Sequence, residues 1–162
     1  MRLNYLLIPL ITIFVAWLGA RFTSRSVREW YPALRKPSWT PPGAVIGIVW
    51  TVLYILASMS AFIVWNLSPL SFTGVPAAIT IVFLANAALN AFWSYTFFAR
   101  RRIGAAIWVC LALDATIVGL IQMLGQVDAA AAWLLVPYAA WVTFAAYLNY
   151  RVWVMNAGSV VE

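Results

Sequence analysis

Residues 44–65, AVIGIVWTVLYILASMSAFIVW, form a stretch of 22 residues without a single charged side chain. A helix needs about 20 mostly apolar residues to cross the roughly 30 Å hydrocarbon core of a bilayer. Four further stretches meet that requirement, at residues 3–22, 75–99, 103–124 and 129–155. Backbone groups in lipid must be paired within the protein, and the alternating pattern of membrane barrel strands is absent. The sequence therefore predicts an all-α membrane bundle of five transmembrane helices.

The composition of the whole chain supports this class of protein. Its 162 residues are 65% hydrophobic and include only 10 Lys and Arg and 4 Asp and Glu, whereas soluble domains are about 45–50% apolar and about 25% charged. With no His and one cysteine, Cys110, the chain has no His/Cys zinc site, His-ligated haem or internal disulfide. We therefore expect no metal site and no required cofactor.

The basic residues lie at the ends of the apolar stretches, which indicates membrane orientation and not nucleic-acid binding. Nine of them fall on one side when alternate connections are grouped: Arg21, Arg25, Arg28, Arg35, Lys36, Arg100, Arg101, Arg102 and Arg151. Because Lys and Arg are retained in cytoplasmic loops, the N-terminus is predicted outside, with the C-terminus and the Arg-rich first and third loops in the cytoplasm.

The connections are short, so we expect one transmembrane domain over residues 1–156 and a short tail over residues 157–162. The chain shows no cleavable presequence and no Arg/Ser-rich leader, which favours a bacterial inner membrane as its location. A cleaved signal peptide at residues 3–22 is the less favoured alternative, because the Arg-rich segment after it would then have to be exported.

The connection between the first two stretches holds four prolines between residues 29 and 43. Proline fixes its own φ and biases the preceding residue toward extended backbone, so a stiff, irregular lid is expected. This lid would present Trp30, Tyr31 and Trp39. Trp and Tyr also gather at the membrane–water interface, and for any one of these residues that explanation holds equally well.

Three polar side chains, Asn86, Asn90 and Asp114, fall at membrane depth, where such groups face the bundle interior or a cavity. Asn86 and Asn90 are one turn apart, and both are able to bond a neighbouring helix. For Asn86 a ligand role is equally favoured, whereas for Asn90 the structural role is preferred. Asp114 must be neutral, paired or hydrated, and a proton relay is disfavoured because its stretch holds no other charge. Cys110, one turn earlier, is expected to be a small buried residue.

Aromatic residues are abundant inside the stretches, with Trp50, Trp93 and Trp141 the notable cases. A cavity lined by flat indoles, a few amide donors and a basic rim suits a flat, mostly apolar ligand that carries acidic groups. A tetrapyrrole has that form, since its macrocycle stacks on Trp and its propionates meet Arg or Lys. For an arbitrary Trp, packing or contact with lipid remains the alternative.

The spacing W-Y-x-x-L-x-K-P-x-W-x-P-P, from Trp30 to Pro42, resembles that of the tryptophan-rich sensory protein family (TspO/MBR), which includes the mitochondrial translocator protein. The resemblance covers roughly residues 3–156. Its further matches are Trp50, Tyr54, Asn86, Asn90, Trp93, Phe97, Phe98, Pro137, Tyr138, Trp141, Leu148, Asn149 and Tyr150.

The resemblance implies a membrane-embedded binding or sensory protein, a receptor for porphyrins such as protoporphyrin IX, sterols or benzodiazepine-site drugs, acting in tetrapyrrole or stress signalling. It places the ligand pocket on Tyr31, Trp39, Pro41, Ile46, Trp50, Tyr54, Asn86, Leu89, Cys110, Trp141 and Ala145. Light- and oxygen-dependent porphyrin degradation is the enzymatic alternative, with Trp50 and Trp141 as candidate catalytic residues. Transport of these ligands is a further alternative, weakened by the absence of an internal repeat.

Two features of the chain qualify this resemblance. Mitochondrial members tend to carry Gln where Asn86 stands, which implies an altered ligand preference. The sterol-recognition pattern is displaced, because Arg151 follows Tyr150 directly, and loose matches elsewhere prove little, so sterol binding is not claimed. The family also commonly forms homodimers, and a contact through Ala87, Ala88 and Ala91 is the expected interface, although packing within the monomer explains these small residues equally well.

Overall fold

The computed structural model describes residues 4–67 and 74–157, and this described part is helical with no strand. Five of its segments are long and apolar enough to cross a bilayer, which confirms the predicted all-α membrane bundle. In chain order its elements are α1 (Asn4–Glu29), the 3-10 turn η1 (Tyr31–Ala33), α2 (Gly43–Leu67), α3 (Gly74–Ser94), the π-helical turn η2 (Tyr95–Ala99), α4 (Ile103–Gly125), α5 (Ala129–Trp133) and α6 (Val136–Asn156).

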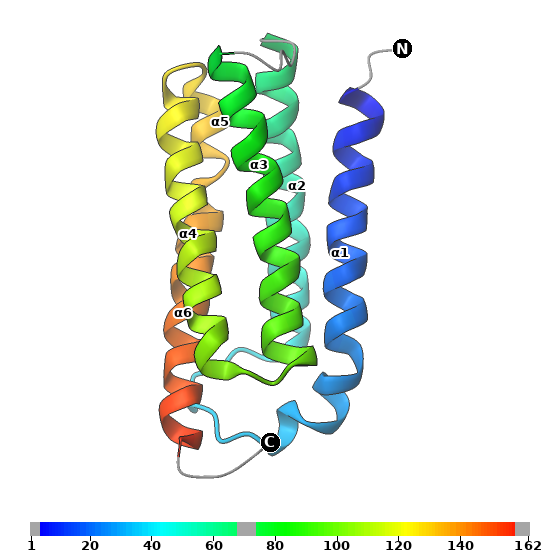
Figure 1. Ribbon diagram of the computed structural model, residues 1–162, viewed down its shortest axis with the longest axis vertical. Helices are drawn as coiled ribbons and strands as arrows, with labels where there is room; N and C mark the ends of the chain where they lie inside the picture. Colours follow the sequence, from blue (N-terminus) through cyan, green and yellow to red (C-terminus); the bar gives the residue numbers. More distant parts are fainter. Residues whose placement is uncertain (1–3, 68–73, 158–162) are drawn as a thin grey trace.

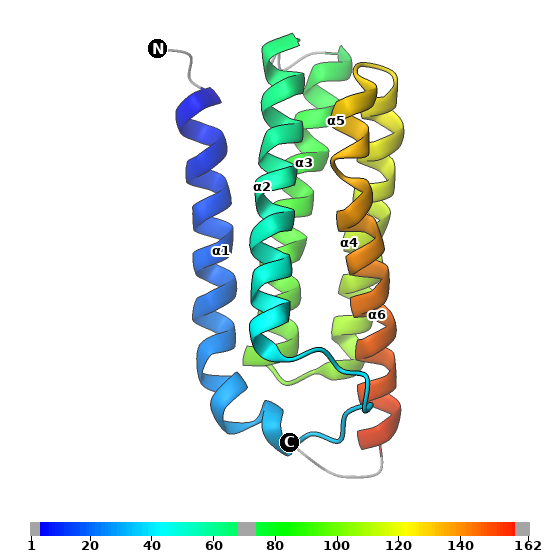
Figure 2. The ribbon, with the colours of Figure 1, turned by 180° about the vertical axis from the view of Figure 1, so that it is seen from behind.

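The helices run side by side along the long axis of the molecule, with α1 at one edge (Figures 1 and 2). Helix α4 is central to the core, because it packs against both α3 and α6. Its side chains Leu113, Ile117, Leu120 and Leu124 are spaced three or four residues apart and are almost completely buried, as expected for one face of a helix. In lipid this close packing itself holds the helices together.

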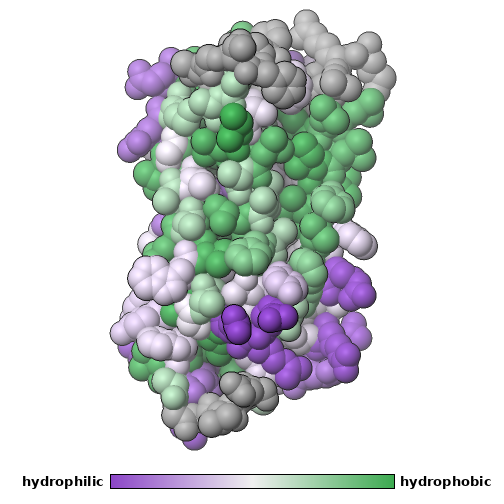
Figure 3. Space-filling model, in the orientation of Figure 1, coloured by the Kyte–Doolittle hydropathy of each residue, from purple (hydrophilic) through white to green (hydrophobic). Residues whose placement is uncertain are grey.

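One end of the bundle gathers the segments that carry the basic residues. The end of α1, the connection from residue 30 to 42, the turn between α3 and α4 and the end of α6 lie together at the lower end of Figure 1. Figure 3 shows hydrophilic side chains at this end and a hydrophobic middle. The grouping of charges expected from the sequence is therefore a property of the fold. Arg2 and the predicted tail beyond residue 157 lie outside the described residues.

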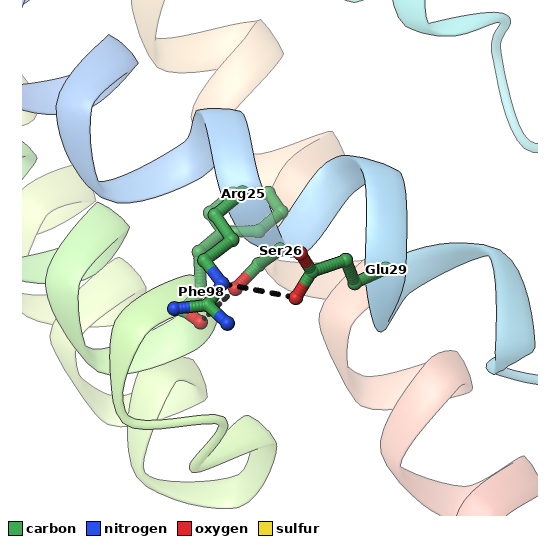
Figure 4. A network of polar contacts seen from close by, with 4 residues as sticks. All are labelled: Arg25, Ser26, Glu29 and Phe98. Carbon is green, nitrogen blue, oxygen red and sulfur yellow. Dashed lines mark hydrogen bonds and ion pairs between the residues drawn. The ribbon is translucent and has the colours of Figure 1, made fainter.

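Two helix boundaries differ from those expected. Helix α1 continues seven residues past Phe22 to Glu29, because loss of apolar character marks the membrane boundary and not the end of a helix. Its last turns carry an exposed Arg25–Glu29 ion pair at 3.0 Å, four residues apart (Figure 4). The fifth apolar stretch is broken into α5 and α6, since Pro137 has no N–H and its ring clashes with the carbonyl of the preceding turn.

The segment that follows α3 is tied to α1 by a polar contact. There α3 passes into η2, whose wider turn changes the direction of the following side chains. Helix ends leave carbonyl groups without partners, and the Ser26 hydroxyl on α1 donates to the carbonyl of Phe98 (Figure 4). This bond fixes the Phe97–Phe98 pair beside α1, where both rings line a cavity.

Candidate functional site

A cavity of about 630 Å³ lies between α1, α2, the α3–η2 segment and α6, at the end of the bundle that holds the Pro-rich connection. We call it the loop-side cavity. Its volume is within the range of small-molecule pockets, about 300–1,000 Å³. Its aromatic lining comes from five elements and consists of Tyr31, Trp50, Tyr54, Trp93, Phe97, Phe98, Trp141 and Phe144.

These rings form two braced walls. On one side, the Trp50 and Trp93 ring centroids are 6.0 Å apart, and Trp93 stacks on Phe97 at 5.9 Å. On α6, the Trp141 and Phe144 centroids are 5.3 Å apart. Aromatic pairs at such separations attract one another beyond their burial alone. The indoles of the cavity wall are therefore held in place by neighbouring rings.

Six of the eleven predicted ligand residues line this cavity: Tyr31, Ile46, Trp50, Tyr54, Trp141 and Ala145. Asn86 lines a different cavity instead. Cys110 is buried and its thiol points to the carbonyl of Val142, and Leu89 packs against the main core. These two side chains belong to the helix packing around the cavity.

The two remaining predicted residues belong to the Pro-rich connection. Trp39 is 43% exposed and stacks on Tyr147 with ring centroids 5.6 Å apart. It also contacts Phe144, a ring of the cavity wall, at 5.8 Å. Pro41 is partly buried and, like Trp39, lies outside the lining of the loop-side cavity. Trp39 therefore contacts a ring of the cavity wall without lining the cavity itself.

The Pro-rich connection packs against the helices of the bundle and is hydrogen-bonded to them. Trp30 and Leu34 are each only 4% exposed and pack with Phe97 and Val152 in a second core cluster. The backbone of Arg35 exchanges two hydrogen bonds with the side-chain amide of Asn156 on α6, at 3.1 and 2.9 Å. Trp30 is therefore a core residue and does not belong to an aromatic belt at the membrane–water interface.

The Lys36 side chain closes the 3-10 turn. Its Nζ donates to the carbonyls of Tyr31 at 2.7 Å and Leu34 at 3.1 Å, and lies 4.6 Å from the centroid of the Tyr31 ring. Burial raises the pKa of Tyr31, so its phenol stays neutral at physiological pH. With Lys36 engaged in the turn, the basic residue that lines the cavity is the exposed Arg28.

Replacing Lys36 with methionine is expected to loosen this turn. The carbonyls of Tyr31 and Leu34 would lose a charged donor, worth about 1.5–3 kcal/mol for a hydrogen bond to a charged group. Amide hydrogen exchange over residues 31–36 should then accelerate about tenfold or more, whereas Arg25→Met, which removes only an exposed pair, should leave it unchanged. Equal exchange in the two variants would show that Lys36 does not hold the turn.

A chain of side-chain hydrogen bonds crosses the bundle at the deep end of the cavity. Tyr54 donates to Asn90 at 2.8 Å, and Asn90 donates to the Tyr138 hydroxyl at 3.0 Å. Tyr138 donates to Asn86 at 3.2 Å, and Asn86 donates to Thr116 at 2.9 Å. These bonds join α2, α3, α6 and α4. Asn90 is therefore bonded to side chains of two neighbouring helices, as expected for a structural role.

Asp114 makes one hydrogen bond to a neutral side chain. Its Oδ2 accepts from Thr143 on α6 at 2.8 Å, while its Oδ1 is buried without a partner. Among the small residues of α3, Ala91 is buried and Ala87 lines a cavity. Ala88 is the exposed one of the three.

Several cavity residues were not singled out as ligand residues from the sequence. Asn149 follows Trp141 by eight residues and Ala145 by four, and this helical spacing places all three on one face of α6. Trp93 and Phe97 are likewise four apart. Arg28 gave no signal, since it resembles any basic residue at a helix end, and other lining residues that were missed include Thr23, Ser24, Ser94, Phe98, Phe144 and Leu148.

Comparison with known proteins agrees with this architecture. The sequence model of the TspO/MBR family matches residues 7–154. The chain belongs to the TspO/MBR family. It is 37% identical over 129 residues to the tryptophan-rich protein TspO of Bacillus cereus, covering 80% of this chain and 82% of that protein. It is 35% identical over 156 residues to the translocator protein of Homo sapiens, covering 96% and 90% of the two chains.

An archaeal relative shows that the similarity extends across nearly the whole chain. The tryptophan-rich protein TspO of Archaeoglobus fulgidus is 32% identical over 148 residues, covering 91% of this chain and 94% of its own. The five spans and the Pro-rich connection of this protein thus belong to the architecture of a TspO/MBR membrane protein.

Proposed function

We propose that this TspO/MBR protein binds a flat tetrapyrrole, protoporphyrin IX, in the loop-side cavity as a membrane-embedded sensory protein. The observation that carries the proposal is the aromatic wall of the cavity, in which Trp50, Trp93 and Trp141 are braced by other rings. A planar macrocycle gains the most from such faces. Arg28 supplies a cation for a propionate at the same cavity.

Unpaired donors in the wall support this ligand class. The indole nitrogens of Trp93 and Trp141 and the amide nitrogen of Asn149 are buried without hydrogen-bond partners, and all three residues line the cavity. Leaving a buried donor unpaired costs about 1–3 kcal/mol. A small turn of these side chains toward ligand oxygen or nitrogen acceptors would remove that cost. A ligand rich in acceptors therefore suits the cavity better than a pure hydrocarbon.

Titration of the purified protein with protoporphyrin IX in the dark tests the proposal, with Trp emission and porphyrin absorbance followed together. We expect saturable quenching, with the Kd raised about three- to tenfold in Trp50→Phe and in Trp141→Phe because part of the stacking face is lost. Trp108→Phe is the matched control, because Trp108 is 74% exposed on α4. The proposal fails if quenching is absent, or if the three variants bind equally well.

A second candidate function is light-driven oxidation of the bound porphyrin. It is favoured by the pair Trp50 and Trp93, whose rings lie 6.0 Å apart in the cavity wall, with Trp141 on the facing helix. Excited porphyrin passes its energy to O₂, which then adds to the macrocycle, and the candidate catalytic residues Trp50 and Trp141 hold the ring during this step. Loss of the porphyrin band in light and air, abolished in Trp50→Phe, would establish turnover, and a band stable under illumination would exclude it.

We also propose the orientation and assembly that the fold best supports. The end with the basic residues faces the cytoplasm of a bacterial cell, as basic loops do, which places the loop-side cavity near the cytoplasmic surface of the inner membrane. A homodimer through α3 would use its outer face, where Ala85 and Ala88 are exposed and three residues apart. Cross-linking of Ala88→Cys in the membrane tests this interface.

A further inference from the structure

A second cavity of about 380 Å³ lies between α1, α2 and α3 in the half of the bundle away from the Pro-rich connection. We call it the distal cavity. The proposed tetrapyrrole site does not use it. Its walls are mostly aliphatic or aromatic, including Leu7, Ile8, Val64, Ile79 and Phe83, and no charged side chain lines it. The chemistry of its lining thus differs from that of the loop-side cavity, which has Arg28 beside it.

The polar chain through the middle of the bundle divides the two cavities. Tyr54 and Asn90 line both of them and are bonded to each other at 2.8 Å. Asn90 is bonded in turn to Tyr138, which lines the distal cavity. A ligand in the distal cavity therefore meets this hydrogen-bonded layer at its inner end and does not pass into the loop-side cavity.

The distal cavity opens toward lipid. Ile11 on α1 and Leu84 on α3 line it and are 38% and 49% exposed, respectively. Both lie within segments long and apolar enough to span the bilayer, about two helical turns from the start of each. A molecule that enters between α1 and α3 therefore comes from the hydrocarbon region, so it must be uncharged and mostly apolar.

The polar groups of the distal cavity specify which kind of neutral molecule fits. The Thr12 hydroxyl lies 2.9 Å from the carbonyl of Ile8, the Ser58 hydroxyl lies 2.8 Å from the carbonyl of Tyr54, and the two hydroxyl oxygens are 2.8 Å apart. The pair has two hydroxyl hydrogens for these three contacts, so both hydrogens are engaged. The groups that remain free on this pair are oxygen lone pairs, which accept a hydrogen bond but cannot donate one.

We propose that the distal cavity is a second binding site, for a neutral long-chain alcohol whose hydroxyl donates to the Thr12–Ser58 pair. Its hydrocarbon body lies against the apolar side chains between α1, α2 and α3. A ligand oxygen without a hydrogen, as in an ether, has no donor for this pair and binds more weakly. The proposal is independent of the tetrapyrrole site, because the linings of the two cavities share only Tyr54 and Asn90.

Photolabelling of the full chain in lipid nanodiscs tests the proposal. The probe is a hexadecanol with a diazirine in its chain, and the competitors are unlabelled 1-hexadecanol and its methyl ether. We expect saturable labelling of α1, α2 and α3 at the distal cavity. The methyl ether should compete about fivefold less well, the worth of one net hydrogen bond. Labelling that does not saturate, or equal competition by alcohol and ether, would show that the cavity contacts lipid chains without binding an alcohol specifically.

Two pairs of variants separate binding from folding. The double change Thr12→Val with Ser58→Ala should abolish the fivefold preference for the alcohol. Ser60→Ala, on the same helix, removes a bond to the carbonyl of Ala131 without touching the cavity and should keep it. Ala61→Phe should block labelling, because Ala61 lines the distal cavity, while Ala145→Phe should not. Loss of preference in Ser60→Ala, or full labelling in Ala61→Phe, would overturn the assignment.

Discussion

Ala145→Phe is expected to weaken protoporphyrin IX binding at least about 30-fold. Ala145 lies between Trp141 and Asn149 on the face of α6 that lines the loop-side cavity. A benzyl group there would occupy space that the macrocycle needs. Forcing extra volume into a packed site costs about 1–3 kcal/mol, and about 2 kcal/mol corresponds to that factor. Dark titration by Trp quenching measures the change.

Ala140→Phe provides the matched control for this experiment, because Ala140 is on the same helix but exposed on its outer face. It adds the same ring without entering the cavity, and its Kd should stay within about twofold of the wild-type value. If Ala145→Phe also binds normally, the porphyrin does not occupy the loop-side cavity. If both variants lose binding equally, the effect lies in α6 packing and not in the site.

Asn90→Ala is expected to lower the free energy of unfolding by about 2 kcal/mol. Asn90 is 2% exposed and accepts from Tyr54 while donating to Tyr138. Interhelical hydrogen bonds in membranes average about 0.6 kcal/mol and reach about 1.7, and the change also leaves the two Tyr hydroxyls short of a partner. Unfolding in mixed micelles with rising SDS measures the loss.

The same unfolding assay defines what would contradict this prediction. Gln122→Ala removes an exposed amide from α4 and should change the free energy of unfolding by less than about 0.5 kcal/mol. Tyr54→Phe should cost less than Asn90→Ala, because it breaks one bond of the chain instead of two. If Asn90→Ala is no more destabilising than Gln122→Ala, the polar chain does not hold the helices together.

The fold follows from the sequence because a bilayer imposes a strict length on apolar segments. Residues 44–65 and the four similar stretches therefore predicted five spans, which the structure confirms. Helix ends were less predictable. The continuation of α1 to Glu29 depends on contacts such as the bond from Ser26 to Phe98, which join residues 72 positions apart. The break before α6 was not predicted, because hydropathy alone gave one continuous stretch and the place of Pro137 in it was not considered.

The site was predictable where its signal is local and hidden where it depends on tertiary structure. Trp50, Trp141 and Ala145 share a cavity, and family resemblance placed them together. The separation of Asn86 from that cavity follows from its bond to Tyr138, a contact between helices far apart in the chain. The distal cavity gave no sequence signal, because aliphatic side chains that line a cavity and those that face lipid look the same in composition.

Mapping of Trp oxidation tests the central claim most directly, since illuminated porphyrin makes singlet oxygen that oxidises the nearest indoles first. The protein would be illuminated in air with one equivalent of protoporphyrin IX, and oxidation at each Trp would be followed by mass spectrometry. The account predicts that Trp50, Trp93 and Trp141 are oxidised first, because they line the loop-side cavity. If oxidation instead follows exposure, beginning at Trp108 and Trp133, which are 74% and 71% exposed, the porphyrin is not bound in this cavity.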